Sequence, residues 1–162
     1  GQVEVSGITV DKVHNSVWMA SWVGEESGRY LYEYDLTGGK YKRKVHLQPV
    51  PQWIQGVLAH NGQLYVTADD GTADEKEPDH IYRVEISDKT NAARVVLEKT
   101  LDDIKDVGEV EGLAVNPQTK QLLVHANRGK QIVLGMPKGF YPGYDREISE
   151  IFFYDMTPRC DK

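Results

Sequence analysis

The chain is poor in cysteine and in positive charge. Cys160 is its one cysteine, so no intrachain disulfide framework exists. Its 19 Lys and Arg residues face 25 Asp and Glu residues, which gives a formal net charge of −6 at pH 7. Phosphate backbones are bound by concentrated positive charge, and the only basic cluster, residues 40–44, includes Tyr41 and is typical of a solvated strand face. These counts argue against a nucleic-acid partner.

Long apolar runs and catalytic motifs are also missing. No window approaches the roughly 18 apolar residues that a membrane span needs. The sequence has no Gly-x-Ser-x-Gly elbow, no His-Glu-x-x-His helix, no phosphate loop and no Cys-x-x-Cys pair. No catalytic residue is therefore named. The compartment stays open, with a secreted or periplasmic one slightly favoured.

What the sequence does contain is an internal repeat. Three segments open with one residue, a glycine and an apolar alternation, and their glycines, Gly7, Gly56 and Gly112, lie 49 and 56 residues apart. This spacing is typical of four-stranded propeller blades with loop insertions. The three segments are Ser6–Val10, Gln55–Ala59 and Glu111–Val115.

Each opening segment precedes a turn signal and a second apolar run, which together predict a hairpin. Asn61-Gly62 is the strongest of these signals, because a type I′ turn needs positive φ at both central residues. The second runs are Ser16–Ala20, Gln63–Thr67 and Gln121–His125. A third run with period-two alternation follows in each unit, at Tyr30–Asp35, His80–Ile86 and Ile151–Met156. Fourth runs follow at Tyr41–Leu47 and Arg94–Leu97, but the third unit has none.

The repeat predicts an all-β fold of antiparallel, four-stranded β-propeller blades. We expect a single partial propeller domain over residues 1–162, with blade 1 at about 3–48, blade 2 at about 52–100 and an incomplete blade 3 at about 108–157. Either the chain is a piece of a longer protein or several copies close a ring, and the first explanation is favoured. Residues 102–107 are the one candidate for a helical turn.

The blade signatures resemble the six-bladed propeller superfamily. That group includes the SMP-30/gluconolactonase, strictosidine-synthase-like, NHL, phytase-like and SdiA-regulated propellers, so the chain is similar to half of a six-bladed ring. The segments that carry the resemblance are Ser6–Ile8, Glu111–Pro117, Tyr82–Val84 and Phe153–Asp155.

The resemblance also suggests chemistry. In gluconolactonase-like members a glutamate in an opening Glu-Gly-Pro binds a divalent metal in the central channel, and Glu111 matches that position. Leu113 replaces the proline, and Ser6 and Gln55 stand at the equivalent points of the other blades. A metal-dependent lactonase or esterase, with Ca²⁺ held by Glu111, Asp69 and Asn127, is the implied alternative function.

Blade geometry gives a second route to a site. Residues before each glycine and at the ends of the second strands are expected to converge on the channel. The favoured function is a binding scaffold that takes a small molecule or carbohydrate there through Gln55, Glu111, Asn127 and Arg128, with Trp22, Asp69 and Asp70 nearby. Alternatively, Glu111 bonds only to backbone amides or to Arg128.

Three further features have two explanations each. Residues 69–79 carry six carboxylates, which suit either a Ca²⁺ ion or, more commonly, solvent. His125 lies in a second strand, and a packing role is favoured for it over a site role. Residues 128–147 form a long, glycine-hinged aromatic insertion that either covers the channel mouth or packs beside a blade.

An open arc of blades exposes a sheet face at each end. Uncovered apolar faces mark association, so we expect self-association, or further blades, to complete the ring. The contact is expected near Trp18 and Phe152. A small molecule or a protein is the expected ligand, with no nucleic acid and no membrane span.

Overall fold

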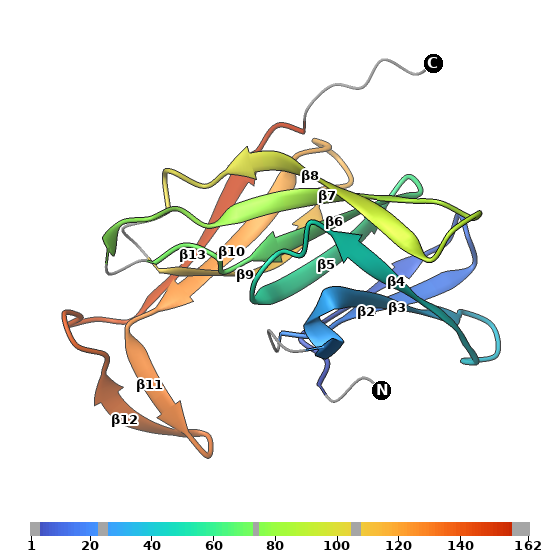
Figure 1. Ribbon diagram of the computed structural model, residues 1–162. Helices are drawn as coiled ribbons and strands as arrows, with labels where there is room; N and C mark the ends of the chain where they lie inside the picture. The colour runs from blue at the N-terminus through green and yellow to red at the C-terminus, as the bar shows by residue number, and fades with distance from the viewer. Residues whose placement is uncertain (1–3, 23–25, 73–74, 105–107, 157–162) are drawn as a thin grey trace.

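The structure is a computed structural model that describes residues 4–22, 26–72, 75–104 and 108–156, and its regular structure is almost entirely β (Figure 1). Blade 1 consists of β1 (Gly7–Asp11), β2 (Ser16–Ala20), β3 (Tyr30–Asp35) and β4 (Tyr41–Gln48). Blade 2 consists of β5 (Ile54–His60), β6 (Gln63–Ala68), β7 (His80–Ile86) and β8 (Ala92–Thr100). In both blades each strand pairs antiparallel with the next.

Blade 3 has three strands among the described residues. These are β9 (Glu109–Val115), β10 (Leu122–Arg128) and β13 (Ile148–Tyr154), with β10 in the middle. Between β10 and β13 the chain forms a separate hairpin, β11 (Lys130–Val133) and β12 (Met136–Phe140), which projects away from the blades (Figure 1). The all-β, propeller-like fold class is therefore confirmed, with the repeat order that the glycine spacing predicted.

The expectation of separate sheets is wrong for blades 1 and 2. Residues His46–Gln48 of β4 pair in parallel with Ala92–Arg94 of β8, which joins the two blades into one eight-stranded sheet. The His46 amide also donates a hydrogen bond to the Asn91 carbonyl over 2.8 Å. An outer strand presents unpaired backbone groups, and these two outer strands satisfy part of theirs with each other.

The hairpin turns follow the sequence signals. Asn61 and Gly62 have φ values of 50° and 73°, as a type I′ turn requires, and Asn15 and Lys120 take the left-handed conformation in the other two blades. The expected helical turn is only partly described: residues 102–104 form a turn without a helix, and 105–107 lie outside the described residues. The structure also contains a short 3-10 helix at Glu26–Arg29 that the sequence pattern does not predict.

Two inner strands carry a bulge at the same point. In β5 the pairing with β6 shifts between Ile54 and Gly56, and in β9 the pairing with β10 shifts at Glu111 and Gly112. A bulge re-aims the side chain that it carries. Gln55 and Glu111 therefore occupy equivalent bulged positions, which explains why the repeat aligns them.

The core lies between blades. One cluster joins the inner face of blade 1, including Trp18 and Leu31, to Leu64 and Val84 of blade 2. The other joins Tyr65 of blade 2 and the connecting segment to blade 3, through residues that include Ile81, Leu101, Val110 and Val124. Blade 2 is thus covered on both faces, because successive residues such as Leu64 and Tyr65 point to opposite sides of the strand.

The apolar side chains exposed at the open end faces are not those that the sequence predicts. Trp18 is only 2% exposed and faces blade 2, and Phe152 packs against the core between blades 2 and 3. The exposed apolar residues are those of opposite parity, such as Ile8 in blade 1 and Ile151 and Phe153 in blade 3. A one-residue error in parity moves a side chain to the other face of a strand.

Among the described residues, no helix is long and apolar enough to cross a membrane.

Leu31 tests the core between blades 1 and 2. Its side chain is fully buried, so we expect Leu31→Ala to lower the free energy of unfolding by about 3 kcal/mol. Leu97→Ala, at a position that is 54% exposed, should change it by no more than about 0.5 kcal/mol. Urea unfolding of both variants measures the difference. Equal effects would show that this face of blade 1 is not packed as described.

Candidate functional site

One pocket gathers the ends of several strands from all three blades. It has a volume of about 280 Å³. Trp22 follows β2, Trp53 precedes β5, Asp69 follows β6, and Arg128 ends β10. The full lining is Trp22, Trp53, Asp69, Gly71, Thr72, Glu109 and Arg128, and we call it the Trp22–Trp53 pocket.

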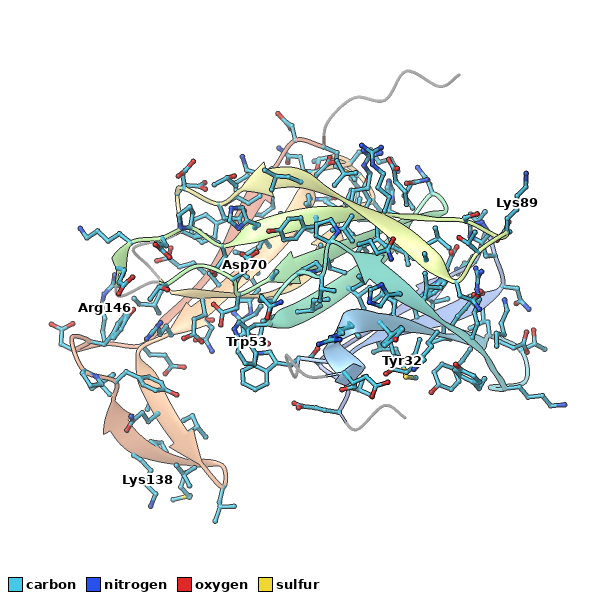
Figure 2. The ribbon with its side chains drawn as sticks, in the orientation of Figure 1. Tyr32, Trp53, Asp70, Lys89, Lys138 and Arg146 are labelled. Carbon is cyan, nitrogen blue, oxygen red and sulfur yellow. The ribbon has the colours of Figure 1, made fainter. Side chains whose placement is uncertain are left out.

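Two tryptophans from different blades form its apolar wall. The ring centroids of Trp22 and Trp53 are 4.7 Å apart, with 40° between the ring planes. The residues are 37% and 39% exposed, and Figure 2 shows the Trp53 ring projecting beyond the ribbon near β5. Large aromatic side chains in contact with each other and with solvent form a ready surface for a ligand.

Backbone geometry fixes Trp53 beside the acidic wall. Trp53 has a φ of 53°, a left-handed conformation that is uncommon for a bulky residue. Its carbonyl accepts a hydrogen bond of 2.9 Å from the Asp69 amide. Strained residues of this kind cluster at functional sites. The same contact positions both the ring of Trp53 and the carboxyl group of Asp69.

Arg128 and Glu109 form an ion pair on the other side of the pocket. Arg128 Nη1 lies 2.9 Å from Glu109 Oε1, and the two residues end and begin neighbouring strands. The Arg128 guanidinium also lies over the rings of Tyr144 and Tyr141, at 5.3 and 5.7 Å from their centroids. These contacts hold the guanidinium group at the pocket edge.

Asp69 is the most perturbed acid of the pocket. Burial, followed by the charges of Asp79, Glu109 and Glu111, raises its pKa to about 8, although Arg128 opposes this shift. Asp79 is buried and accepts hydrogen bonds from the amides of Val110 at 2.9 Å and Gly71 at 3.0 Å.

The pKa of Asp79 is also raised, mainly by burial, although the amides of Val110 and Gly71 and the neighbouring Asp69 act to lower it. Asp69, with its pKa near 8, holds a proton near neutral pH.

The predicted binding residues are only partly brought together. Arg128 lines the pocket, as do Trp22 and Asp69, whereas Gln55, Glu111 and Asn127 are not among its described lining residues. Glu111 is half-buried and close enough to act on Asp69, and burial and then Glu109 raise its pKa. Its carbonyl accepts a hydrogen bond from Thr67 Oγ1 over 2.5 Å. Gln55 and Asn127 are half-buried on β5 and β10, and Asn127 lies opposite Glu109.

Asp70 and His125 point to other partners. Asp70 accepts hydrogen bonds from Tyr82 at 2.5 Å and lies 2.7 Å from His80 Nδ1. Burial and this carboxylate raise the pKa of Tyr82. His125 Nε2 lies 3.0 Å from Ser149 Oγ in the neighbouring strand β13. Neither residue lines the Trp22–Trp53 pocket.

The metal site that the sequence predicts has no set of coordinating side chains among the described residues. In the described ranges, no three His, Cys, Asp or Glu side chains are placed so that they could hold a metal ion. A Ca²⁺ ion at Glu111, Asp69 and Asn127 therefore stays a prediction, and so does the lactonase activity that the ion would support.

The insertion at residues 128–147 neither covers the channel mouth nor packs beside a blade, the two arrangements considered from the sequence. Residues 128–147 do not lie flat on a blade, since most of them build the β11–β12 hairpin that extends outward (Figure 1). Only its base, through Tyr141 and Tyr144, contacts the pocket residue Arg128.

Sequence reasoning missed Trp53 and Glu109, and it placed Asp79 in an acidic loop without expecting it to be buried beside Asp69. A usable signal existed for Glu109, because it stands two residues before Glu111 on the same strand and period two places both on one face. Trp53 comes directly before a predicted strand opening, as Trp22 comes after a second strand. Nothing in the sequence marks the positive φ of Trp53 or the pairing of Asp79 with Asp69.

A larger hollow, of about 360 Å³, lies between blades 1 and 2 at the opposite strand ends. Its buried acid Glu33 contacts Lys42 at 2.8 Å and Arg43 at 2.7 Å. Burial alone would raise the pKa of Glu33, but hydrogen bonds from Lys42, Ser16 and Arg43 prevail and lower it. The tryptophan among its described lining residues, Trp18, is buried and offers no surface to a ligand. We therefore place the candidate site at the Trp22–Trp53 pocket, whose tryptophans are partly exposed.

The topology and this pocket define an all-β, propeller-like protein with a pocket at the strand ends. No protein-family model and no curated protein matches the chain. Among solved structures it is similar to the crystal structure of the Myceliophteria thermophila Cps50 (Swd1) β-propeller domain, with 13% sequence identity and a TM-score of 0.47. The likeness covers 78% of this chain and 36% of that chain.

The raised pKa of Asp69 predicts a pH-dependent stability. Asp69 has a pKa of 3.8 when unperturbed and about 8 in the fold, so folding takes up a proton between these values. Its stabilising contribution is complete below pH 4 and is lost as the pH rises towards 8. We expect the melting temperature to fall between pH 5 and 8.5 in the native protein and to fall less in Asp69→Asn.

Asp145→Asn, at an exposed position, is the matched control and should keep the native pH profile. Thermal unfolding followed by circular dichroism gives all three curves. Parallel curves for Asp69→Asn and the native protein would show that Asp69 is ionised in the fold at neutral pH.

Proposed function

We propose that this propeller-like chain is a binding scaffold whose Trp22–Trp53 pocket takes a small hydroxylated ring, such as a monosaccharide unit. The observation that carries the proposal is the pair of solvent-exposed tryptophans in contact across two blades, beside acidic and basic groups in one pocket.

The chemistry of the wall supports this ligand class. The apolar C–H face of a sugar ring covers an aromatic surface, and its hydroxyl groups both donate and accept hydrogen bonds. Asp69 and Glu109 offer acceptor oxygens, and Arg128 offers donors. Binding sites of small molecules commonly combine an apolar wall with a few placed polar groups.

The size of the pocket limits the ligand. A volume of about 280 Å³ is at the small end of ligand pockets, which suits one ring and not a long chain held along its length. A larger carbohydrate would therefore bind through one residue, with the rest in solvent.

Trp53 gives the direct test. We expect monosaccharides and their methyl glycosides, titrated up to about 20 mM, to bind with dissociation constants near 1 mM, which corresponds to only about 4 kcal/mol. Trp53→Ala should weaken binding at least about tenfold, because it removes a central aromatic anchor. Trp53→Phe, which keeps a ring, should retain part of the affinity.

Calorimetry and tryptophan fluorescence report both quantities. Tyr41→Ala removes an exposed aromatic ring that lies outside the pocket and should leave binding unchanged. Binding that survives Trp53→Ala would place the ligand elsewhere, and no binding of any sugar would remove the carbohydrate proposal.

A further inference from the structure

The β11–β12 hairpin exposes an apolar tip. Every residue of β12 is exposed, and Ile132, Val133, Leu134 and Met136 all face solvent at the outer end. Leu134 is 98% exposed. Contiguous apolar surface of this kind on a projecting element marks an interaction site.

The turn residue strengthens this argument. Leu134 and Gly135 link the two strands with φ values of 51° and 77°, a two-residue turn that favours Asn-Gly or Asp-Gly. Leucine at the first position has an unfavourable backbone conformation and an apolar side chain in water. Neither the turn nor a core explains this leucine, whereas contact with a partner does.

The arm also carries charge of one sign. Residues 129–144 include Lys130 and Lys138 and contain no Asp or Glu, although Lys130 Nζ lies 3.7 Å from Glu147 Oε2 at the base. Lys138 is therefore the cation that the outer part of the arm presents. The Tyr141 amide closes the base of the arm with a hydrogen bond of 2.8 Å to the Gly129 carbonyl. Arg128, at the end of β10, lies over Tyr141 and Tyr144 and holds this base against blade 3. The hairpin is therefore an anchored, basic, apolar arm.

The complementary surface lies on the outer face of blade 1. A shallow hollow of about 650 Å³ there is mainly apolar, and its carboxylates come from Glu4 and Asp35. We call it the blade 1 hollow. Its lining residues are Glu4, Val5, Ile8, Val17, Met19, Tyr34, Asp35, Leu36 and Gly39.

Arm and hollow belong to opposite ends of the blade stack. The arm leaves blade 3 and projects outward (Figure 1). The hollow is lined by Val17 and Met19, whose neighbour Trp18 points the other way into the core shared with blade 2, so the hollow lies on the opposite face of blade 1. An arm anchored at its base and projecting outward does not reach the hollow of its own chain. The arm can, however, reach the blade 1 hollow of a second copy of the chain.

We propose that the β11–β12 arm of one copy docks in the blade 1 hollow of a second copy. Leu134, Val133 and Met136 enter the apolar floor, and Lys138 meets the carboxylates of Asp35 and Glu4. The contact is heterologous, so each copy keeps one free arm or one free hollow. Such contacts extend into chains or close into rings, and do not stop at a symmetric dimer.

Sedimentation equilibrium of the full chain over a range of concentrations tests this proposal. We expect the average mass to rise with concentration and to pass that of a dimer. Leu134→Asn suits the turn, and it should weaken association at least about tenfold, as Ile8→Asp should from the hollow. Ile151→Asp, on the exposed face of blade 3 and outside the hollow, is the matched control and should leave association unchanged.

A mixing experiment is sharper still. The Leu134→Asn chain keeps its hollow, and the Ile8→Asp chain keeps its arm. Each should be monomeric alone, and an equimolar mixture should form a one-to-one dimer that grows no further. Asp35→Lys combined with Lys138→Glu should associate more tightly than either single change. Circular dichroism confirms that each variant is folded.

A monomer at every concentration would overturn the proposal. So would association that is unaffected by Leu134→Asn, because another surface would then be responsible. Binding of a monomeric chain to phosphatidylcholine vesicles that contain phosphatidylserine, lost in Leu134→Asn, would assign the arm to an anionic lipid surface instead. None of these results depends on the Trp22–Trp53 pocket.

Discussion

Face-to-face packing of neighbouring sheets is the constraint on which the rest of the structure depends. A four-stranded sheet has two faces, and blade 2 buries both, Leu64 and Val84 against blade 1 and Tyr65 and Ile81 against blade 3. Hydrophobic burial of this kind is the main favourable contribution to folding. The packing also sets the relative positions of the inner strands, and thereby brings Trp22, Trp53 and Arg128 from three blades to one place.

The pocket depends on backbone detail that the packing alone does not determine. The left-handed Trp53 and the hydrogen bond from Asp69 to its carbonyl set the aromatic wall against the acidic one. Bulges at Gln55 and at Glu111 bend the inner strands close to these residues. Burial, and next the charge of Asp79, raise the pKa of Asp69 to about 8 and so keep a proton on it at neutral pH. The site therefore combines groups that are ionised with one that is not.

Local pattern predicted the strands well because each blade repeats the same alternation. The ranges Ser16–Ala20, Tyr30–Asp35 and His80–Ile86 agree with the structure residue for residue. Local sequence pattern does not predict which distant segments contact each other in the fold. Trp18 was assigned to the wrong face, since alternation reveals two faces but not which one a neighbour covers. The β4–β8 pairing and the raised pKa of Asp69 likewise depend on segments brought together by folding. Arg128, Trp22 and Asp69 were anticipated from the repeat, whereas Trp53 and Glu109 were not.

The short parallel pairing of β4 with β8 has a consequence for how the molecule comes apart. Blades 1 and 2 share backbone hydrogen bonds as well as a side-chain core, whereas blade 3 meets blade 2 through the second apolar cluster and through side-chain bonds such as Thr67 to Glu111. Cooperative unfolding units follow such boundaries. Blades 1 and 2 are therefore expected to protect their amides from hydrogen exchange as one unit. Blade 3 opens separately, and because Arg128 and Glu109 belong to it, the pocket loses one wall before the remaining core is exposed.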